Sequence, residues 1–129
     1  MPQLHALIID DNIRNVNVLG NLLSYENISH ASITNPLQLE TLLNDSGEFH
    51  LVFLDLEMPG LTGYDVLTKL KQDQRFAGIP IVACTVNTSE IRAARQKGFS
   101  GFIGKPLDPD KFPQQLARIL NGEPVWEAN

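Results

Sequence analysis

The segment from Leu51 to Gly60, with the sequence Leu-Val-Phe-Leu-Asp-Leu-Glu-Met-Pro-Gly, constrains the fold more than any other part of the chain. Four apolar residues run directly into Asp55, and a Pro-Gly pair ends the pattern a few residues later. An apolar run of this kind is typical of a strand buried on both faces of a parallel sheet. Asp55 is then expected at the carboxyl end of a central strand, where open α/β sheets bind their ligands. Taken alone, the segment fits equally well an aspartate that only ends a strand and begins a turn.

The same kind of pattern occurs five times. Strand candidates alternate with segments whose apolar residues recur at helical spacing, and short loops join them. The predicted strands cover residues 4–9, 29–34, 51–54, 79–85 and 99–103, and the predicted helices cover about 13–25, 36–46, 63–71, 88–98 and 109–121. This alternation predicts right-handed crossovers and therefore a doubly wound α/β domain with a five-stranded parallel sheet covered on both faces.

Local signals place several helix starts. Asn35-Pro36 and Asp108-Pro109 each combine a capping residue with proline at the first helical position. Asn87 and Glu90 have the spacing of a capping box. We therefore expect helices to begin directly after residues 35, 87 and 108.

Composition and charge exclude several classes of function. A chain of 129 residues fits one domain, and a hydrophobic fraction of 43% supplies one core. The net charge of −5 argues against binding to nucleic acid or to an anionic membrane surface. Every apolar run is too short to span a membrane, and the N-terminus lacks a signal-peptide layout. The single cysteine, Cys84, excludes an intrachain disulfide, so we expect a cytoplasmic protein without membrane insertion.

Polar side chains follow four of the predicted strands. Asp10-Asp11, Asp55, Thr85 and Lys105 each come directly after an apolar run or at its end. Because parallel strands present their carboxyl ends at one edge, we expect these side chains to share a crevice. Three carboxylates this close repel one another, and a bound divalent cation removes that cost. Since no His or Cys lies at these strand ends, the expected ion is Mg²⁺.

Such a site suits phosphoryl transfer. Asp55 is the best candidate for the nucleophile because it lies on the central strand, between the acidic pair Asp10-Asp11 and Lys105. The acidic pair would bind the metal, directly or through water, and the backbone carbonyl of Glu57 could reach the same ion. Thr85 and Lys105 would contact phosphoryl oxygens.

Four segments carry a resemblance to a known family. They are residues 8–12 (Ile-Ile-Asp-Asp-Asn), 55–63 (Asp-Leu-Glu-Met-Pro-Gly-Leu-Thr-Gly), 83–85 (Ala-Cys-Thr) and 105–106 (Lys-Pro). Together they resemble the signature of the response-regulator receiver domain, the CheY-like family. The resemblance covers residues 1–121 and leaves 122–129 as a C-terminal tail. It implies a flavodoxin-like (βα)5 three-layer sandwich with strand order 2-1-3-4-5, which is the known order of that family.

The resemblance implies a role for each residue of the crevice. Asp55 matches the phosphoacceptor of the family. Asp10 and Asp11 match the acidic pair that holds Mg²⁺. Thr85 matches the switch hydroxyl, and Lys105 matches the lysine that contacts the phosphoryl group.

The resemblance also implies a switch. Phe102 matches the family's switch aromatic, and the peptide bond between Lys105 and Pro106 is expected to be cis. After phosphorylation, Thr85 would move toward the phosphoryl group and Phe102 would turn inward. The face formed by the helix over 88–98, the strand over 99–103 and the helix over 109–121 would then shift. The helix over 88–98 has a thin apolar stripe and is expected to be the least firmly anchored.

The implied function is that of a phosphoacceptor response regulator in two-component (His-Asp) signal transduction. The phosphoryl group would come from a sensor histidine kinase or a histidine phosphotransfer protein, and the downstream target is unknown. The protein would be a stoichiometric phosphoacceptor with slow self-dephosphorylation and not an enzyme. Two residues depart from the family pattern: Val86, which could narrow access to Asp55, and Gly104, which could loosen the lysine loop.

Other interpretations remain open. An aspartyl-phosphate phosphatase of the haloacid dehalogenase type needs a second aspartate where this chain has Glu57. A flavodoxin-like FMN carrier needs phosphate-binding amides in the first loop, where Asp10-Asp11-Asn12 would repel phosphate. The chain could also be a binding module that works without phosphorylation, or the receiver fragment of a larger hybrid kinase.

Overall fold

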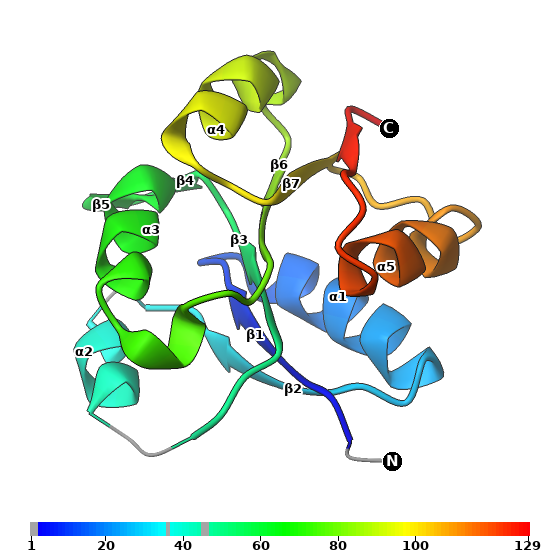
Figure 1. The fold of residues 1–129 in the computed structure, drawn as a ribbon. Helices are drawn as coiled ribbons and strands as arrows, with labels where there is room; N and C mark the ends of the chain where they lie inside the picture. Colours follow the sequence, from blue (N-terminus) through cyan, green and yellow to red (C-terminus); the bar gives the residue numbers. More distant parts are fainter. Residues whose placement is uncertain (1–2, 36, 45–46) are drawn as a thin grey trace.

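A parallel sheet forms the middle layer of the computed structural model, which describes residues 3–35, 37–44 and 47–129. The strand order is β2-β1-β3-β6-β7-β8 (Figure 1). The strands are β1 (His5–Ile9), β2 (Ser29–Ile33), β3 (Leu51–Leu54), β6 (Ile81–Thr85), β7 (Gly101–Gly104) and β8 (Trp126–Glu127). The first five have the 2-1-3-4-5 order that the resemblance implied. The sixth strand was not predicted.

Among the residues that the structure describes, five α-helices cover the sheet. They are α1 (Ile13–Tyr25), α2 (Gln38–Leu43), α3 (Gly63–Lys71), α4 (Ile91–Lys97) and α5 (Phe112–Leu120). Helices α1 and α5 pack on one face, and α2, α3 and α4 pack on the other (Figure 1). A short hairpin of β4 (Glu57–Met58) and β5 (Leu61–Thr62) follows β3, and two 3-10 turns, η1 (Gln74–Phe76) and η2 (Thr88–Glu90), precede β6 and α4.

The central strand β3 shows why its sequence is continuously apolar. Val52 and Leu54 point into the core under α2, α3 and α4, whereas Leu51 and Phe53 point into the core under α1 and α5. All four are at most 1% exposed. Because successive side chains of a strand alternate between faces, a strand covered on both sides needs an apolar residue at every position.

Two helix starts differ from the predictions. The helix expected after residue 87 begins at Ile91, and the side chain of Asn87 makes no capping hydrogen bond. The helix expected after residue 108 begins at Phe112, because Asp108 accepts a hydrogen bond from the N–H of Asp110 and so holds a separate turn. In both places a polar side chain closes a local or distant contact instead of capping the helix.

Two other starts are capped by side chains, and a third is preceded by an asparagine turn. Asn12 caps α1 by accepting from the N–H groups of residues 14 and 15, and Thr62 forms a capping box with Asp65 at α3. Asn35 accepts from the N–H of Leu37 just before α2. The proline predicted at the first position of that helix, Pro36, and the helix end predicted at Ser46 lie outside the described residues.

The C-terminal segment joins the sheet. β8 runs parallel to β7, with Phe102 opposite Trp126, and the N–H of Phe102 donates to the carbonyl of Val125 at 2.7 Å. Figure 1 shows this segment between α4 and α5. Within the part of the chain that the structure describes, none of the helices has the length and apolar character needed to cross a bilayer.

Candidate functional site

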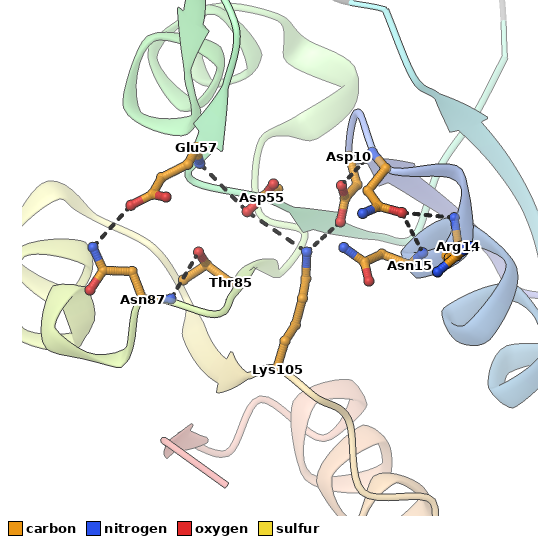
Figure 2. Close-up of polar contacts among 9 residues, drawn as sticks. Asp10, Arg14, Asn15, Asp55, Glu57, Thr85, Asn87 and Lys105 are labelled. Atoms are coloured by element: carbon orange, nitrogen blue, oxygen red, sulfur yellow. Dashed lines mark hydrogen bonds and ion pairs between the residues drawn. The ribbon is translucent and has the colours of Figure 1, made fainter.

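A pocket of about 290 Å³ opens at the carboxyl ends of β1, β3 and β7. Its polar lining comes from Asp10, Asn15, Asp55 and Lys105 (Figure 2). Each of these residues follows a strand or lies in the first turn of α1, so the parallel topology brings them together from positions up to 95 residues apart.

Three carboxylates meet at this edge. Asp10 and Asp55 are buried, with 4% and 8% exposure, while Asp11 is exposed. One oxygen from each lies within 4.8 Å of the other two. Oxygen donors in such an arrangement, with one carboxylate open to solvent, suit a hard cation that keeps part of its water shell. The donor set therefore fits the expected Mg²⁺.

Lys105 lies between the two buried carboxylates. Its Nζ forms an ion pair with Asp10 and lies 3.8 Å from Oδ1 of Asp55 (Figure 2). Burial lowers the pKa of Lys105, but the hydrogen bond to Asp10 and the nearby negative charges outweigh it, so the net pKa is raised. The ammonium therefore stays charged and offsets part of the repulsion between the carboxylates.

Asp55 has an unusual protonation equilibrium. Burial raises its pKa to about 6; Lys105 opposes this rise, Asp10 adds to it, and hydrogen bonds from the N–H of Glu57 and from Thr85 lower it. The N–H of Glu57 lies 3.5 Å from Oδ1 of Asp55. The raised pKa therefore reflects mainly the cost of burying a charged carboxylate, and the neighbouring charge of Asp10 adds to that cost.

Thr85 and Phe102 lie on neighbouring strands behind the pocket. Both are fully buried, and β6 pairs with β7 so that Thr85 faces Gly104. The hydroxyl of Thr85 accepts a hydrogen bond from the N–H of Asn87 at 3.4 Å. Phe102 packs in the core under α2, α3 and α4, so its side chain is already turned inward in this structure. The switch roles of Thr85 and Phe102 stay predictions.

The loop after β7 contains the cis peptide bond that the resemblance implied. The peptide bond between Lys105 and Pro106 is cis. The N–H of Lys105 donates to the carbonyl of Thr85 at 2.9 Å, so the loop is fixed to β6. Gly104 is buried against the C-terminal segment, which gives its small size a packing reason instead of the expected looseness.

One contact at the rim was not foreseen. The side-chain amide of Asn87 donates to Oε1 of Glu57 at 2.9 Å and so connects the β4–β5 hairpin to the turn before α4 (Figure 2). Sequence alone gave no sign of this pairing, because the two residues are 30 residues apart. Val86 is 66% exposed and does not line the pocket, so the expected narrowing of access is not seen. Coordination by the carbonyl of Glu57 stays a prediction.

Fold and site together define a doubly wound α/β domain with an acidic crevice, whose donor set suits a divalent cation, at the point where the strand order reverses. The family model described as "Response regulator receiver domain" matches residues 6–117. The chain belongs to this family and is a receiver domain of the kind found in two-component response regulators.

Individual relatives agree with this assignment. The chain is 26% identical to the two-component response regulator ORR3 of Oryza sativa subsp. indica, over 92% of both chains. It is 30% identical to the two-component response regulator ARR7 of Arabidopsis thaliana, over 91% of this chain and 64% of the relative.

Solved structures show the same fold at low identity. A putative response regulator from Chloroflexus aurantiacus superposes with a TM-score of 0.82 at 19% identity, covering 93% of this chain and 99% of the other. The receiver domain of a sensor histidine kinase from Pseudomonas aeruginosa has a TM-score of 0.78 at 19% identity, with the same coverage of both chains. That structure has a magnesium ion coordinated in its active-site cleft.

Proposed function

We propose that Asp55 accepts a phosphoryl group from the phosphohistidine of a sensor histidine kinase or a histidine phosphotransfer protein. The observation that carries this proposal is the position of Asp55: its carboxylate lies at the end of the central strand, in a pocket that also contains Asp10 and Lys105. Its 8% exposure leaves the side chain accessible from the pocket while most of it is shielded from water.

The transfer is a substitution at phosphorus. An oxygen of the ionised Asp55 carboxylate forms the new P–O bond, and the P–N bond to the donor histidine breaks. The bonding electrons stay on the imidazole, which takes up a proton as it leaves. The product is an acyl phosphate on Asp55, and Lys105 is placed to shift its Nζ from Asp10 toward a phosphoryl oxygen.

A divalent cation has a ready set of ligands. Asp10, Asp11 and Asp55 would hold Mg²⁺, with the carbonyl of Glu57 as a further donor. When bound, the ion would neutralise part of the negative charge on the phosphoryl oxygens. The magnesium in the cleft of the Pseudomonas aeruginosa receiver supports this assignment.

The response would travel through Thr85 to the face formed by α4, β7 and α5. The buried hydroxyl of Thr85 would hydrogen-bond to a phosphoryl oxygen and pull on the turn before α4. Ala94 is the buried residue of α4, and Ile91 packs only partly against the core. A helix with so few buried contacts can shift at low cost, which supports its role as the moving element.

The protein would act as a stoichiometric phosphoacceptor. The chain would take up one phosphoryl group and lose it slowly to water, and it would not turn over phosphate esters. Incubation with a small phosphoryl donor tests this point, because an enzyme would consume an excess of the donor without stable labelling of the protein.

The test is incubation of the protein with acetyl phosphate and Mg²⁺, followed by mass spectrometry of the intact chain. We expect a mass gain of one phosphoryl group that is lost at alkaline pH, as expected of an acyl phosphate. Asp55→Asn should abolish the gain, and Asp110→Asn, an exposed aspartate outside the pocket, should leave it unchanged. Labelling that survives in Asp55→Asn, or no labelling at all, would refute the proposal.

A further inference from the structure

The last residues of the chain fill a groove along β7. Val125 is fully buried among side chains of α5 and the sheet, and Trp126 stacks under the guanidinium of Arg95 on α4, with 5.3 Å between the Arg95 Cζ and the ring centroid. The segment thus bridges the two helices on either side of β7 (Figure 1). Its backbone lies in register with β7, as an added strand would.

Two glycines of β7 make room for this segment. A Cβ on Gly101 would lie 2.9 Å from the carbonyl oxygen of Val125, and a Cβ on Gly104 would overlap with the carbonyl oxygen of Ala128. Any other residue at these two positions would push the added strand away from β7. The edge of the sheet is therefore shaped for a second backbone at close distance.

Side chains of α5 recognise the acidic residue of the segment. Glu127 accepts from Nε2 of Gln115 at 2.7 Å and from Nη1 of Arg118 at 2.8 Å. Nη2 of Arg118 also donates to the carbonyl of Pro124 at 2.7 Å, and the side-chain amide of Asn129 donates to the carbonyl of Gly104. The groove thus binds an apolar, an aromatic and an acidic residue in succession.

The fit of the resident segment is incomplete. Gln115 is fully buried, and its Oε1 has no hydrogen-bond partner among the described residues. Its Nε2 donates to both Glu127 and Asn129, which fixes the amide orientation and leaves the acceptor unpaired. A ligand that offered a donor at this place would fit the groove better than the chain's own residues do.

We propose that the groove between α4 and α5 binds an extended segment of a partner protein with an apolar, an aromatic and an acidic residue in succession, and that residues 123–129 occupy it as a resident competitor. The partner segment adds to the edge of β7 in the place of β8. Because the resident segment is tethered, it competes at an effective concentration on the order of millimolar, and the groove opens only when this segment leaves.

The test uses a fluorescein-labelled peptide with the sequence of residues 123–129 and the full-length chain. In the variant Trp126→Ala/Glu127→Lys, the resident segment loses its contacts to Arg95, Gln115 and Arg118, and both substituted residues are partly exposed. We expect the peptide to bind this variant saturably, at least about tenfold more tightly than it binds the unmodified chain, because the tethered competitor has been weakened. The matched control is Glu123→Lys, an exposed residue of the same segment with the same change of charge. It should behave like the unmodified chain.

Two further measurements complete the test. A peptide with Lys in place of its second Glu should bind the double variant weakly, and the additional substitution Arg118→Glu in the protein should reverse this preference. In the unmodified chain, an excess of a peptide with Phe in place of Trp should shift the emission of Trp126, the only tryptophan, to longer wavelength. Equal, non-saturable binding to the double variant and the unmodified chain, together with an unchanged Trp126 emission, would overturn the proposal. These assays need no phosphoryl group, so their outcome is independent of the role of Asp55.

Discussion

Two polar clusters lie close to the carboxyl end of β7 and differ in how their charges are balanced. The acidic cluster contains Asp10, Asp11 and Asp55 with Lys105, so three negative charges meet one positive charge and two remain. The C-terminal cluster contains Gln115, Arg118, Glu127 and Asn129, in which one cation meets one anion and the other two groups are neutral amides.

The pKa shifts of the two clusters go in opposite directions. The pKa of Asp55 is raised, mainly by burial. The pKa of Glu127 is lowered by its hydrogen bonds from Gln115 and Arg118. Burial of the Asp55 charge outweighs its contacts with Lys105 and with hydrogen-bond donors, whereas the donors around Glu127 outweigh its burial. The acidic cluster is thus built to receive a further ligand, and the C-terminal cluster is complete in charge without one.

Removal of Lys105, the cation of the acidic cluster, should produce the largest difference in stability between the two clusters. Lys105→Met leaves the buried carboxylates of Asp10 and Asp55 without their ammonium, and breaking a buried ion pair from one side costs roughly 3 kcal/mol or more. Urea unfolding in EDTA should show this loss of stability, and excess Mg²⁺ should restore part of it. The control is Lys69→Met, which removes a largely exposed ion pair with Glu40 and should cost less than about 1 kcal/mol. Equal losses in the two variants would contradict the contrast.

Magnesium should stabilise the protein through the acidic cluster alone. At a concentration about a hundred times its dissociation constant, a ligand that binds only the folded state contributes about 2.7 kcal/mol. Thermal unfolding should therefore move to higher temperature with MgCl₂ in the unmodified chain. The shift in unfolding temperature should be much smaller in Asp11→Asn, an exposed member of the cluster. It should be as large as in the unmodified chain in Asp110→Asn. A full shift in Asp11→Asn would remove this residue from the proposed ligand set.

Loss of the charge on Asp55 should stabilise the metal-free protein. The folded-state pKa of about 6 lies above the unfolded-state pKa of 3.8. The ionised carboxylate therefore destabilises the fold fully at pH values above 6, and this destabilisation disappears at pH values below 4. The full shift corresponds to roughly 3 kcal/mol, and solvent in the pocket screens part of it. In EDTA, Asp55→Asn should therefore be more stable than the unmodified chain by roughly 1–2 kcal/mol at pH 7.5. Denaturant unfolding at several pH values should show this advantage shrinking as the pH falls from 6 to 4. An advantage that does not depend on pH would point to packing instead of charge.

The two clusters also differ in how far the sequence could predict them. The acidic cluster follows from strand ends that parallel topology gathers at one edge, and Asp10, Asp55 and Lys105 lie together in the structure as expected. The strand order itself came from the family resemblance. The continuous apolar run of β3 was informative because burial on both faces leaves no alternative at any of its positions.

The C-terminal cluster could not be predicted in the same way. β8 has two residues and therefore no periodicity, and its place depends on glycines of β7 and side chains of α5 that are distant in sequence. The expected capping box of Asn87 failed because its Oδ1 accepts from the hydroxyl of Ser89, while its amide group donates to Glu57, 30 residues away. Local sequence patterns predict helices and strands whose buried faces show as a periodicity of apolar residues. They miss contacts that single polar side chains make with residues distant in sequence.

The smallest effect is expected from the charge-balanced cluster. Glu127→Gln keeps the shape of the side chain and removes its charge, and the side chains of Arg118 and Glu127 are each about a third exposed. Solvent screens such a pair, so the loss should be about 0.5 kcal/mol and should be independent of Mg²⁺. Since the pKa of Glu127 is lowered in the folded state, its contribution is present above the unfolded-state pKa of 4.5 and is lost as the pH falls through the lower folded-state pKa. Urea unfolding of both proteins between pH 3 and pH 7 would measure this. A difference that persists at the acidic end, or one as large as that of Lys105→Met, would show that the C-terminal cluster carries a charge imbalance of its own.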